Sequence, residues 1–250
     1  MGSPITEAQR YGGPKSTNER LHRRKGGYRF AVATHETTVE QFSRFRKNHS
    51  FNREYSREER SPANVITWYD AVAYCNWLSQ QEGIAEEQWC YTIDPQDPMK
   101  VQMAADFMSR RGYRLPTEFE WEYACRAESR TSRPHGETKE LLTRYAWYAD
   151  NSGTEFTMPV GTLRPNDFGM FDMFGNIFEW NQEFYEPYSS NYINTANPTQ
   201  SLKVDKEMLR LLRGGSFNNQ ALFVRSAVRL TSPPDIRSYI FGFRASRTYD

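Results

Sequence analysis

Asn176 and Glu179 are the side chains best placed, by type and spacing, to hold a metal ion. Their oxygens lie three residues apart in a loop, and the backbone at Phe174 and Ile177 can add carbonyl oxygens. Calcium prefers such an all-oxygen set, so we predict a structural calcium ion here that fixes a long loop. The alternative is that both side chains only hydrogen-bond the loop backbone.

The cysteines and histidines show no spacing typical of catalysis. Cys75, Cys90 and Cys125 form no C-x-x-C pair, and three cysteines cannot all be paired within one chain. We expect buried, reduced thiols, with one Cys75–Cys125 or Cys90–Cys125 disulfide as the alternative. The four histidines lack H-x-x-x-H and H-E-x-x-H spacing, and no Walker loop, G-x-S-x-G motif or kinase motif set is present. The spacing of these residues therefore indicates no convincing nucleophile, redox-metal ligand or general base.

Charged residues within apolar segments are expected to be structural. Three acids fall in the first turn of a predicted helix, where the helix dipole explains them: Glu118, Glu120 and Glu122. Five arginines are expected to pair with carboxylates or loop carbonyls: Arg114, Arg213, Arg225, Arg229 and Arg244. An alternative for Arg225 is that it lines a binding pocket. The other lining residues would be Trp180, Ser216 and Asn219.

Helices and short strands are predicted to position these residues. A strand is expected over Tyr28–Ala33. Helices are expected after the caps Thr37/Thr38, from Thr67 to Gly83, near Val101–Arg110, and after the capping box Thr117-x-x-Glu120. The helical period disappears from about residue 145, and short strands are expected at 145–148, 159–163, 210–217, 225–230 and 240–245.

Composition and charge limit the functional classes. Aromatic residues make up 15% of the 250, which favours a loop-rich fold with large rings in its core. The net charge of +1 provides no global field to attract nucleic acid. No apolar run is long enough to insert into a membrane, and no secretory signal opens the chain, so a cytoplasmic location is expected. We expect one domain over 28–250, with 1–27 as its polar N-terminal arm.

Three phrases of the sequence resemble the formylglycine-generating-enzyme, or sulfatase-modifying-factor, family. They are 164–180, which includes Gly175-Asn-x-x-Glu-Trp180, 112–126, and 212–217 followed by 241–244. The resemblance implies a single-domain α+β fold, similar to C-type lectins, with long loops and little regular secondary structure. It also implies a calcium site at the Asn176 phrase and a second one at Asn151 and the carbonyl of Ser152.

The sequence departs from this family where the chemistry is expected. The family holds copper(I) with two cysteines shortly after its Gly-Gly-Ser phrase, because thiolates suit that soft ion. Here the region after Gly214 contains no cysteine, so no copper is expected. The three-histidine iron site of other relatives is absent as well. A non-catalytic ligand- or protein-binding module is therefore our first hypothesis. The alternatives are an oxidoreductase with altered chemistry and a structural accessory domain.

The segments 37–45, 65–83 and 86–91 most resemble a bacterial subgroup in which this domain is appended to large proteins, often after a Ser/Thr kinase domain. Covalent attachment to a larger multidomain protein is therefore expected. Related scaffolds display a recognition surface on the loops after Gly-Gly-Ser, and aromatic and amide side chains suit the binding of a protein or peptide. In this chain the surface would comprise Phe217, Asn218, Asn219, Gln220, Phe223, Arg225 and Tyr239.

Overall fold

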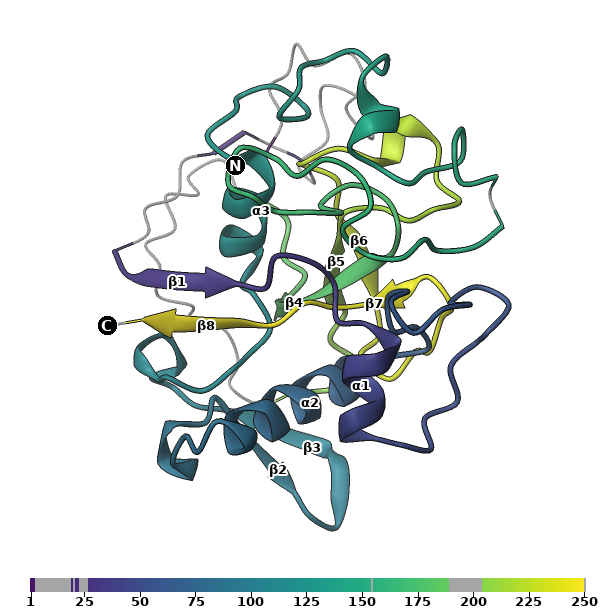
Figure 1. Ribbon diagram of the computed structural model, residues 1–250. Helices are drawn as coiled ribbons and strands as arrows, with labels where there is room; N and C mark the ends of the chain where they lie inside the picture. The colour runs from purple at the N-terminus through teal and green to yellow at the C-terminus, as the bar shows by residue number, and fades with distance from the viewer. Residues whose placement is uncertain (3–18, 20, 23–26, 154, 189–203, 250) are drawn as a thin grey trace.

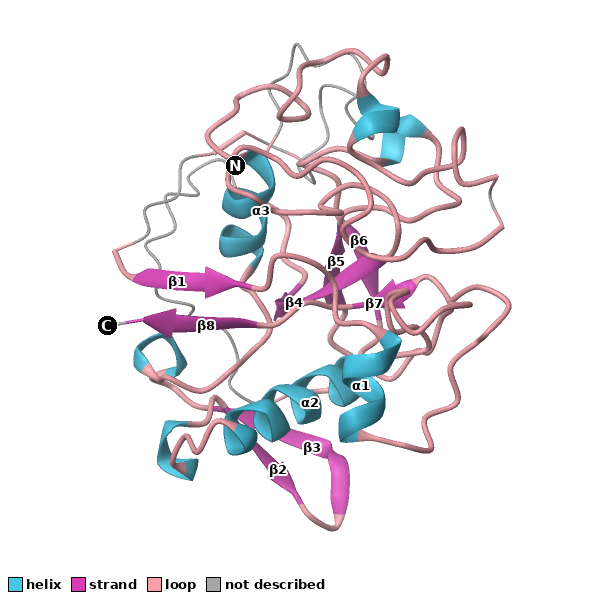
Figure 2. Cartoon of the chain, viewed as in Figure 1, coloured by secondary structure: helices cyan, strands magenta, loops and turns pink. Residues whose placement is uncertain are grey.

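The computed structural model describes residues 1–2, 19, 21–22, 27–153, 155–188 and 204–249. Within them it has an α+β fold in which loops connect short helices and small sheets, as Figure 2 shows. The helices are α1 (Val39–Phe45), α2 (Trp68–Gln81) and α3 (Glu118–Arg126), with 3₁₀ turns η1 (Glu86–Gln88), η2 (Phe107–Ser109), η3 (Leu142–Arg144) and η4 (Ala221–Phe223). The strands are β1 (Arg29–Val32), β2 (Tyr91–Asp94), β3 (Asp97–Met103), β4 (Phe178–Phe184), β5 (Arg210–Arg213), β6 (Leu230–Ser232), β7 (Phe241–Gly242) and β8 (Ser246–Tyr249).

All three α-helices begin with a capping box. The threonines Thr38, Thr67 and Thr117 each accept a hydrogen bond from the backbone amide three residues later, and the acid or amide side chain at that position bonds back to the threonine amide. Each box satisfies two of the amides that a helix start otherwise leaves without partners. The predicted starts are therefore confirmed, and so is the inward packing of Trp121 and Cys125 on α3.

One predicted helix is wrong. Residues 97–103 form strand β3, which pairs antiparallel with β2, and only the 3₁₀ turn η2 follows. The burial of β3 alternates at its end, with Val101 and Met103 inside and Gln102 exposed. This period of two belongs to a strand with one buried face. A pairing partner in β2 thus overrode the local helical signal.

Several of the short strands expected after residue 145 are present, and others are not. β5, β6 and β7 lie within or next to the predicted ranges 210–217, 225–230 and 240–245. Residues 159–163 form no strand, and 145–148 contribute only an isolated bridge between Trp147 and Gly175. The sequence pattern also missed β4 and β8, which carry buried polar residues where alternation predicts apolar ones.

The four-stranded sheet, in the order β6-β5-β4-β7, lies at the centre of the molecule (Figure 1). Helix α2 packs below it with α1 in this view, and α3 stands on the other side of the β1–β8 pair. Two apolar clusters fill the space between these elements: a larger one around Trp68 and Trp180, and a smaller one around Trp121. Both the first and the last strand of the chain therefore join the same body, through the β1–β8 pairing.

In the described residues, no helix is long and apolar enough to cross a membrane.

Candidate functional site

The loop that follows β5 turns sharply at two glycines with positive φ. Gly214 has φ +96° and Gly215 has φ +85°, and a Cβ on Gly215 would lie 2.9 Å from the carbonyl oxygen of Phe223. Beyond the turn, the Asn219 side chain accepts a hydrogen bond from the amide of Ser216 at 3.0 Å, and Asn218 accepts one from the Ser216 hydroxyl at 2.8 Å. The two asparagines thereby hold the loop in shape from within.

Aromatic rings support this loop from a neighbouring segment. Tyr55 stacks on Tyr239 with ring centroids 4.0 Å apart and planes 16° from parallel. Phe217 lies 5.9 Å from Tyr55 and is fully buried. The partly or fully exposed residues define what we call the aromatic–amide face: Tyr55, Asn218, Asn219, Gln220, Phe223 and Tyr239. Tyr55 was missed from the sequence, because it lies in a charged, irregular stretch far from the loop it supports.

Four residues predicted to contact a ligand are buried instead. Trp180, Ser216, Phe217 and Arg225 have no exposed surface. The indole of Trp180 donates to the carbonyl of Ile66 at 2.9 Å, in the larger core cluster. Burial therefore corrects the prediction that Trp180, Ser216 and Arg225 line an open pocket. It also corrects the prediction that Phe217 belongs to an exposed recognition surface.

Arg225 pairs with the N-terminal arm. Its Nη1 and Nη2 lie 3.1 and 3.2 Å from the two carboxylate oxygens of Glu19, which is also fully buried, and its Nε donates to the carbonyl of Leu222. The structural interpretation of Arg225 is thus the correct one. The pairing also ties one described residue of the arm to the loop beneath the aromatic–amide face.

We predicted that the helix dipole explains the three acids of α3, but each of them forms a buried ion pair with an arginine. Glu120 binds Arg114 through two contacts of 2.6 Å, Glu118 binds Arg229 at 2.6 Å, and Glu122 binds Arg213 at 2.5 Å. These six side chains are all buried. The predicted pairing of the arginines is therefore confirmed. These guanidinium–carboxylate contacts, which are bidentate for Arg114 and Arg229, hold α3 against the central strands and the chain ends.

Glu122 makes one of these pairs sensitive to pH. Burial alone would raise the pKa of Glu122, but the neighbouring Arg126 and Arg213 outweigh burial and lower the pKa to about 2. The resulting stabilisation is present above the ordinary pKa of 4.5 and is lost as pH falls toward 2, which amounts to about 3 kcal/mol. We expect the difference in unfolding free energy between wild type and Glu122→Gln to shrink by that amount between pH 5.5 and pH 2. Urea unfolding across this range measures it, and a constant difference would contradict the assignment.

The three thiols lie inside the protein. Cys75, Cys90 and Cys125 are free and fully buried, which confirms the prediction of reduced, buried thiols over a disulfide. Burial raises the pKa of Cys90 to about 11 and that of Cys125 to about 12, and it raises the pKa of Cys75 well above its ordinary value. Reactive cysteines are exposed and have lowered pKa values, so these three are not poised as nucleophiles.

The residues predicted to bind calcium already have protein partners. The Asn176 side chain exchanges two hydrogen bonds with the backbone of Met158, at 2.9 and 3.2 Å. Both carboxylate oxygens of Glu179 accept from Arg244, at 2.6 and 2.8 Å, and one also accepts from the Trp121 indole at 2.8 Å. The alternative interpretation, that these side chains hold the loop, describes this geometry. These contacts favour that alternative, and a calcium ion at Asn176 and Glu179 stays a prediction.

Asn151 of the second predicted calcium site is likewise engaged. It accepts a hydrogen bond from the amide of Tyr148 at 2.9 Å and donates to the carbonyl of Ala146 at 2.8 Å. The Ser152 hydroxyl donates to the carbonyl of Phe217 at 2.6 Å, and the role assigned to the Ser152 carbonyl stays a prediction. Phe174 and Ile177 from the first set were predicted to contribute backbone carbonyls; their side chains are buried in the interior, and the role of the carbonyls stays a prediction. Among the described residues, no three His, Cys, Asp or Glu side chains group as metal ligands.

Two other buried carboxylates have oxygens without a hydrogen-bond donor among the described residues. Both oxygens of Glu36 and Oδ1 of Asp172 are buried and accept no hydrogen bond from any residue that the structure describes. Oδ2 of Asp172 accepts from the amide of Gly161 at 2.7 Å. Burial, followed by the charge of Asp172, raises the pKa of Glu36 well above its ordinary value, and burial also raises the pKa of Asp172. Sequence reasoning missed this pair, because its members are 136 positions apart (172 minus 36).

Together, the small central sheet, the capped helices and the long loops define the α+β architecture of the formylglycine-generating-enzyme and C-type-lectin-like folds. The chain belongs to the family of the sulfatase-modifying factor enzyme 1-like domain, whose family model matches residues 10–249. Among solved structures, it is similar to Treponema denticola variable protein 1, with a TM-score of 0.78 and 25% identity over 88% of this chain and 84% of that one. PvdO from Pseudomonas aeruginosa has a TM-score of 0.75 at 23% identity, over 100% and 90%.

Sequence relatives come from two kinds of protein. The formylglycine-generating enzyme of Mus musculus is 25% identical over 74% of this chain and 44% of its own length. The serine/threonine-protein kinase pkn1 of Chlamydia pneumoniae is 28% identical over 75% of this chain and 24% of its own length. The chain thus spans less than half of the length of each of these two relatives. The resemblance to both the enzymes and the kinase-appended domains is confirmed.

Proposed function

We propose that this chain is a non-catalytic module that binds a protein or peptide through the aromatic–amide face, within a larger protein. The main support is the face itself: stacked tyrosines lie beside partly exposed amides, and the amides stand on a loop whose shape the protein fixes internally. Such a surface loses little conformational freedom on binding. The larger context rests on the relatives, of which pkn1 carries this region in about a quarter of its length.

The alternative of altered oxidase chemistry has no comparable support. All three thiols of the chain are buried, and burial raises their pKa values. The region after Gly215 supplies asparagines and aromatic rings where the resemblance leads one to expect copper ligands. Incubating the protein with a cysteine-containing peptide, copper(I) and oxygen tests this point. Conversion of the peptide cysteine above a protein-free control would overturn the non-catalytic assignment.

The binding face is tested by exposed substitutions. We expect a triple alanine variant at Asn218, Gln220 and Phe223 to lose a partner captured from a cell extract, with affinity weakened at least about tenfold. A matched control replaces Leu209 and Ile236, which are 39% and 43% exposed and lie outside the face. Quantitative pull-down followed by titration of the purified partner measures the effect. Equal binding by both variants would refute the assigned face.

We place the calcium ion of this proposal at Glu36 and Asp172, not at Asn176 and Glu179. Three of their four carboxylate oxygens are buried without a donor among the described residues, and Arg244 beside them is already paired with Glu179. Leaving carboxylates buried without a counter-charge is costly, and a calcium ion would compensate them with oxygen ligands that it prefers. In that position the ion would brace the segment before α1 against the loop before β4.

Calcium is expected to raise the melting temperature of the protein. At a concentration of 100 times Kd the gain would be about 2.7 kcal/mol, or several degrees for a domain of this size. The double variant Glu36→Gln, Asp172→Asn should lose this response. Asp167→Asn, in the same loop but exposed, should keep it. Thermal melts with calcium and with a chelator measure this rise in melting temperature. If the double variant showed the same rise, Glu36 and Asp172 would be excluded as calcium ligands.

A further inference from the structure

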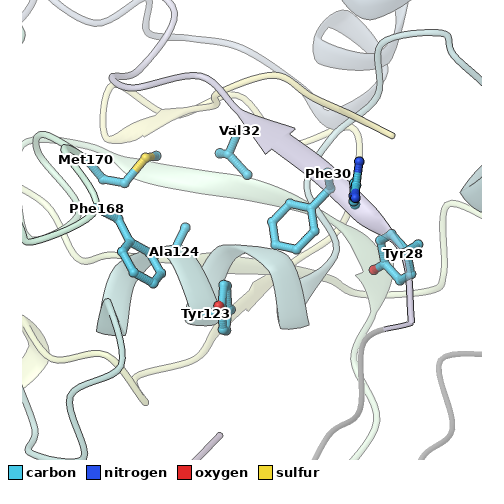
Figure 3. Close-up of a pocket in the computed structure, with 8 residues that line it drawn as sticks. Tyr28, Phe30, Val32, Tyr123, Ala124, Phe168 and Met170 are labelled. Atoms are coloured by element: carbon cyan, nitrogen blue, oxygen red, sulfur yellow. The ribbon is translucent and has the colours of Figure 1, made fainter. Parts of the chain in front are cut away.

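A groove lies between strand β1 and helix α3, away from the aromatic–amide face. Its volume is about 330 Å³. Figure 3 shows Phe30 and Val32 extending from β1 toward α3, where Tyr123 and Ala124 form the facing wall, with Phe168 and Met170 at one end. None of the described residues that line the groove belongs to the aromatic–amide face. It is therefore a separate surface.

The walls of the groove are a continuous series of aromatic rings. Phe30 meets Tyr123 edge to face at 6.0 Å, and Tyr123 lies 5.5 Å from Phe168. Tyr28 extends the series on the other side of Phe30, at 5.9 Å. Tyr123 is 44% exposed and Phe168 is 41% exposed, although each carries a large apolar ring. Exposed aromatic rings gathered in a hollow are typical of a recognition surface.

The open edge of β1 borders this groove. Among the strands that the structure describes, β1 pairs only with β8, and the amide of Ala33 donates to the carbonyl of Ala245 at 2.8 Å. In an antiparallel pair, every second residue directs its N–H and C=O groups toward the partner strand, and the residues between direct theirs away from it. Because Ala33 bonds Ala245, the residue that directly precedes β8, the N–H and C=O groups of Phe30 and Val32 point away from β8. They bond no other residue that the structure describes. At the next outward position, the Thr34 carbonyl accepts the amide of Phe171 at 2.8 Å, so the chain already places a backbone donor against this edge.

We propose that the groove binds an extended segment of a partner polypeptide, which adds as a strand to the edge of β1. The outward backbone groups of Phe30 and Val32 would supply main-chain hydrogen bonds, and alternate apolar side chains of the segment would enter between Tyr123 and Phe168. Arg29 lines the same groove, is exposed, and has no carboxylate partner among the described residues. A carboxylate on the segment therefore complements it, and the ligand class is an extended apolar peptide with an acidic residue.

A designed peptide tests the proposal directly. The probe is a fluorescein-labelled octapeptide in which valine and phenylalanine alternate with threonine, with one glutamate near its end. Main-chain bonds depend little on sequence, so this probe is sufficient. We expect saturable binding by fluorescence anisotropy, and slower hydrogen exchange at the amides of Phe30 and Val32. The double variant Tyr123→Ser, Phe168→Ser should weaken binding at least about tenfold.

Matched variants distinguish strand addition in the groove from adsorption of the probe elsewhere on the protein. Tyr249→Ser removes an aromatic ring that is 52% exposed and outside the groove, so it should bind as wild type does. The triple variant of the aromatic–amide face should also bind normally, which keeps the two proposals independent. No binding at millimolar probe, or equal binding of a probe N-methylated at alternate residues, would overturn strand addition. Sedimentation tests whether a second copy of the chain occupies the groove. If the wild type is a dimer and Tyr123→Ser is a monomer, the groove is a dimer interface and the proposal is wrong.

Discussion

Gly175→Ala is expected to cost about 4 kcal/mol or more of folding stability, among the largest effects of any single substitution in the chain. A Cβ on Gly175 would lie 1.9 Å from the carbonyl oxygen of Trp147 and 2.8 Å from its carbonyl carbon. Neither atom can yield as a flexible side chain would, because that carbonyl accepts the amide of Asn176 at 2.8 Å. Relief therefore requires moving the loop that precedes β4. Urea unfolding of the purified variant measures the loss.

Gly169→Ala is the matched control for this prediction. Gly169 has the same φ of +76°, but nothing lies within 4 Å of the position that its Cβ would take. Its substitution carries only the strain of a left-handed conformation, about 1 kcal/mol. Equal losses in the two variants would show that backbone strain, not the contact with Trp147, explains the effect at Gly175.

The helices were readable from the sequence because their signals are local. A threonine followed three positions later by Gln, Asp or Glu marks the start of each α-helix, and the structure contains every one of these boxes. The strands were harder, because the residues that decide them are distant in the chain. β3 depends on β2, and β8 depends on β1, which lies more than 200 positions earlier.

The candidate site shows the same limit. The loop after Gly215 was predicted to be a recognition surface. Part of it is exposed, but the sequence could not tell which side chains face outward. Phe217 is buried beneath Tyr55, and Arg225 is covered through Glu19 of the N-terminal arm. Asn176 and Glu179 have suitable oxygens, yet Met158 and Arg244 use them. Chemical type alone does not reveal whether a tertiary partner has already been found.

Buried ion pairs fix the relative positions of segments in this fold, a role that longer sheets and helices have in more regular folds. Arg114 lies before α3, Arg213 ends β5, and Arg244 lies between β7 and β8, and each is fully buried. Their carboxylate partners come from α3 and β4. A guanidinium can bond two oxygens in a fixed plane and so fix the relative orientation of two segments that share no ladder. Such a scaffold tolerates long loops, but breaking a pair should be costly.

Glu120→Gln is expected to destabilise the protein by about 3–5 kcal/mol, since it leaves Arg114 buried without its counter-charge. The substitution keeps the shape of the side chain and its role in the capping box, where Gln41 serves α1 in the same way. The loss therefore reports the charge and not the cap.

The exposed pair Glu40–Arg44 provides the comparison for Glu120→Gln. Its atoms lie 2.7 Å apart, much like the 2.6 Å of the buried pair, but the side chains are 53% and 68% exposed. Glu40→Gln should cost less than about 0.5 kcal/mol, because water and salt screen the charge. Urea unfolding of both variants at neutral pH makes the comparison. If Glu120→Gln lost no more than Glu40→Gln, then Thr248 and Ser246, which also contact Arg114, would suffice to hold it. The buried carboxylate would then not be what fixes α3 to the last strand.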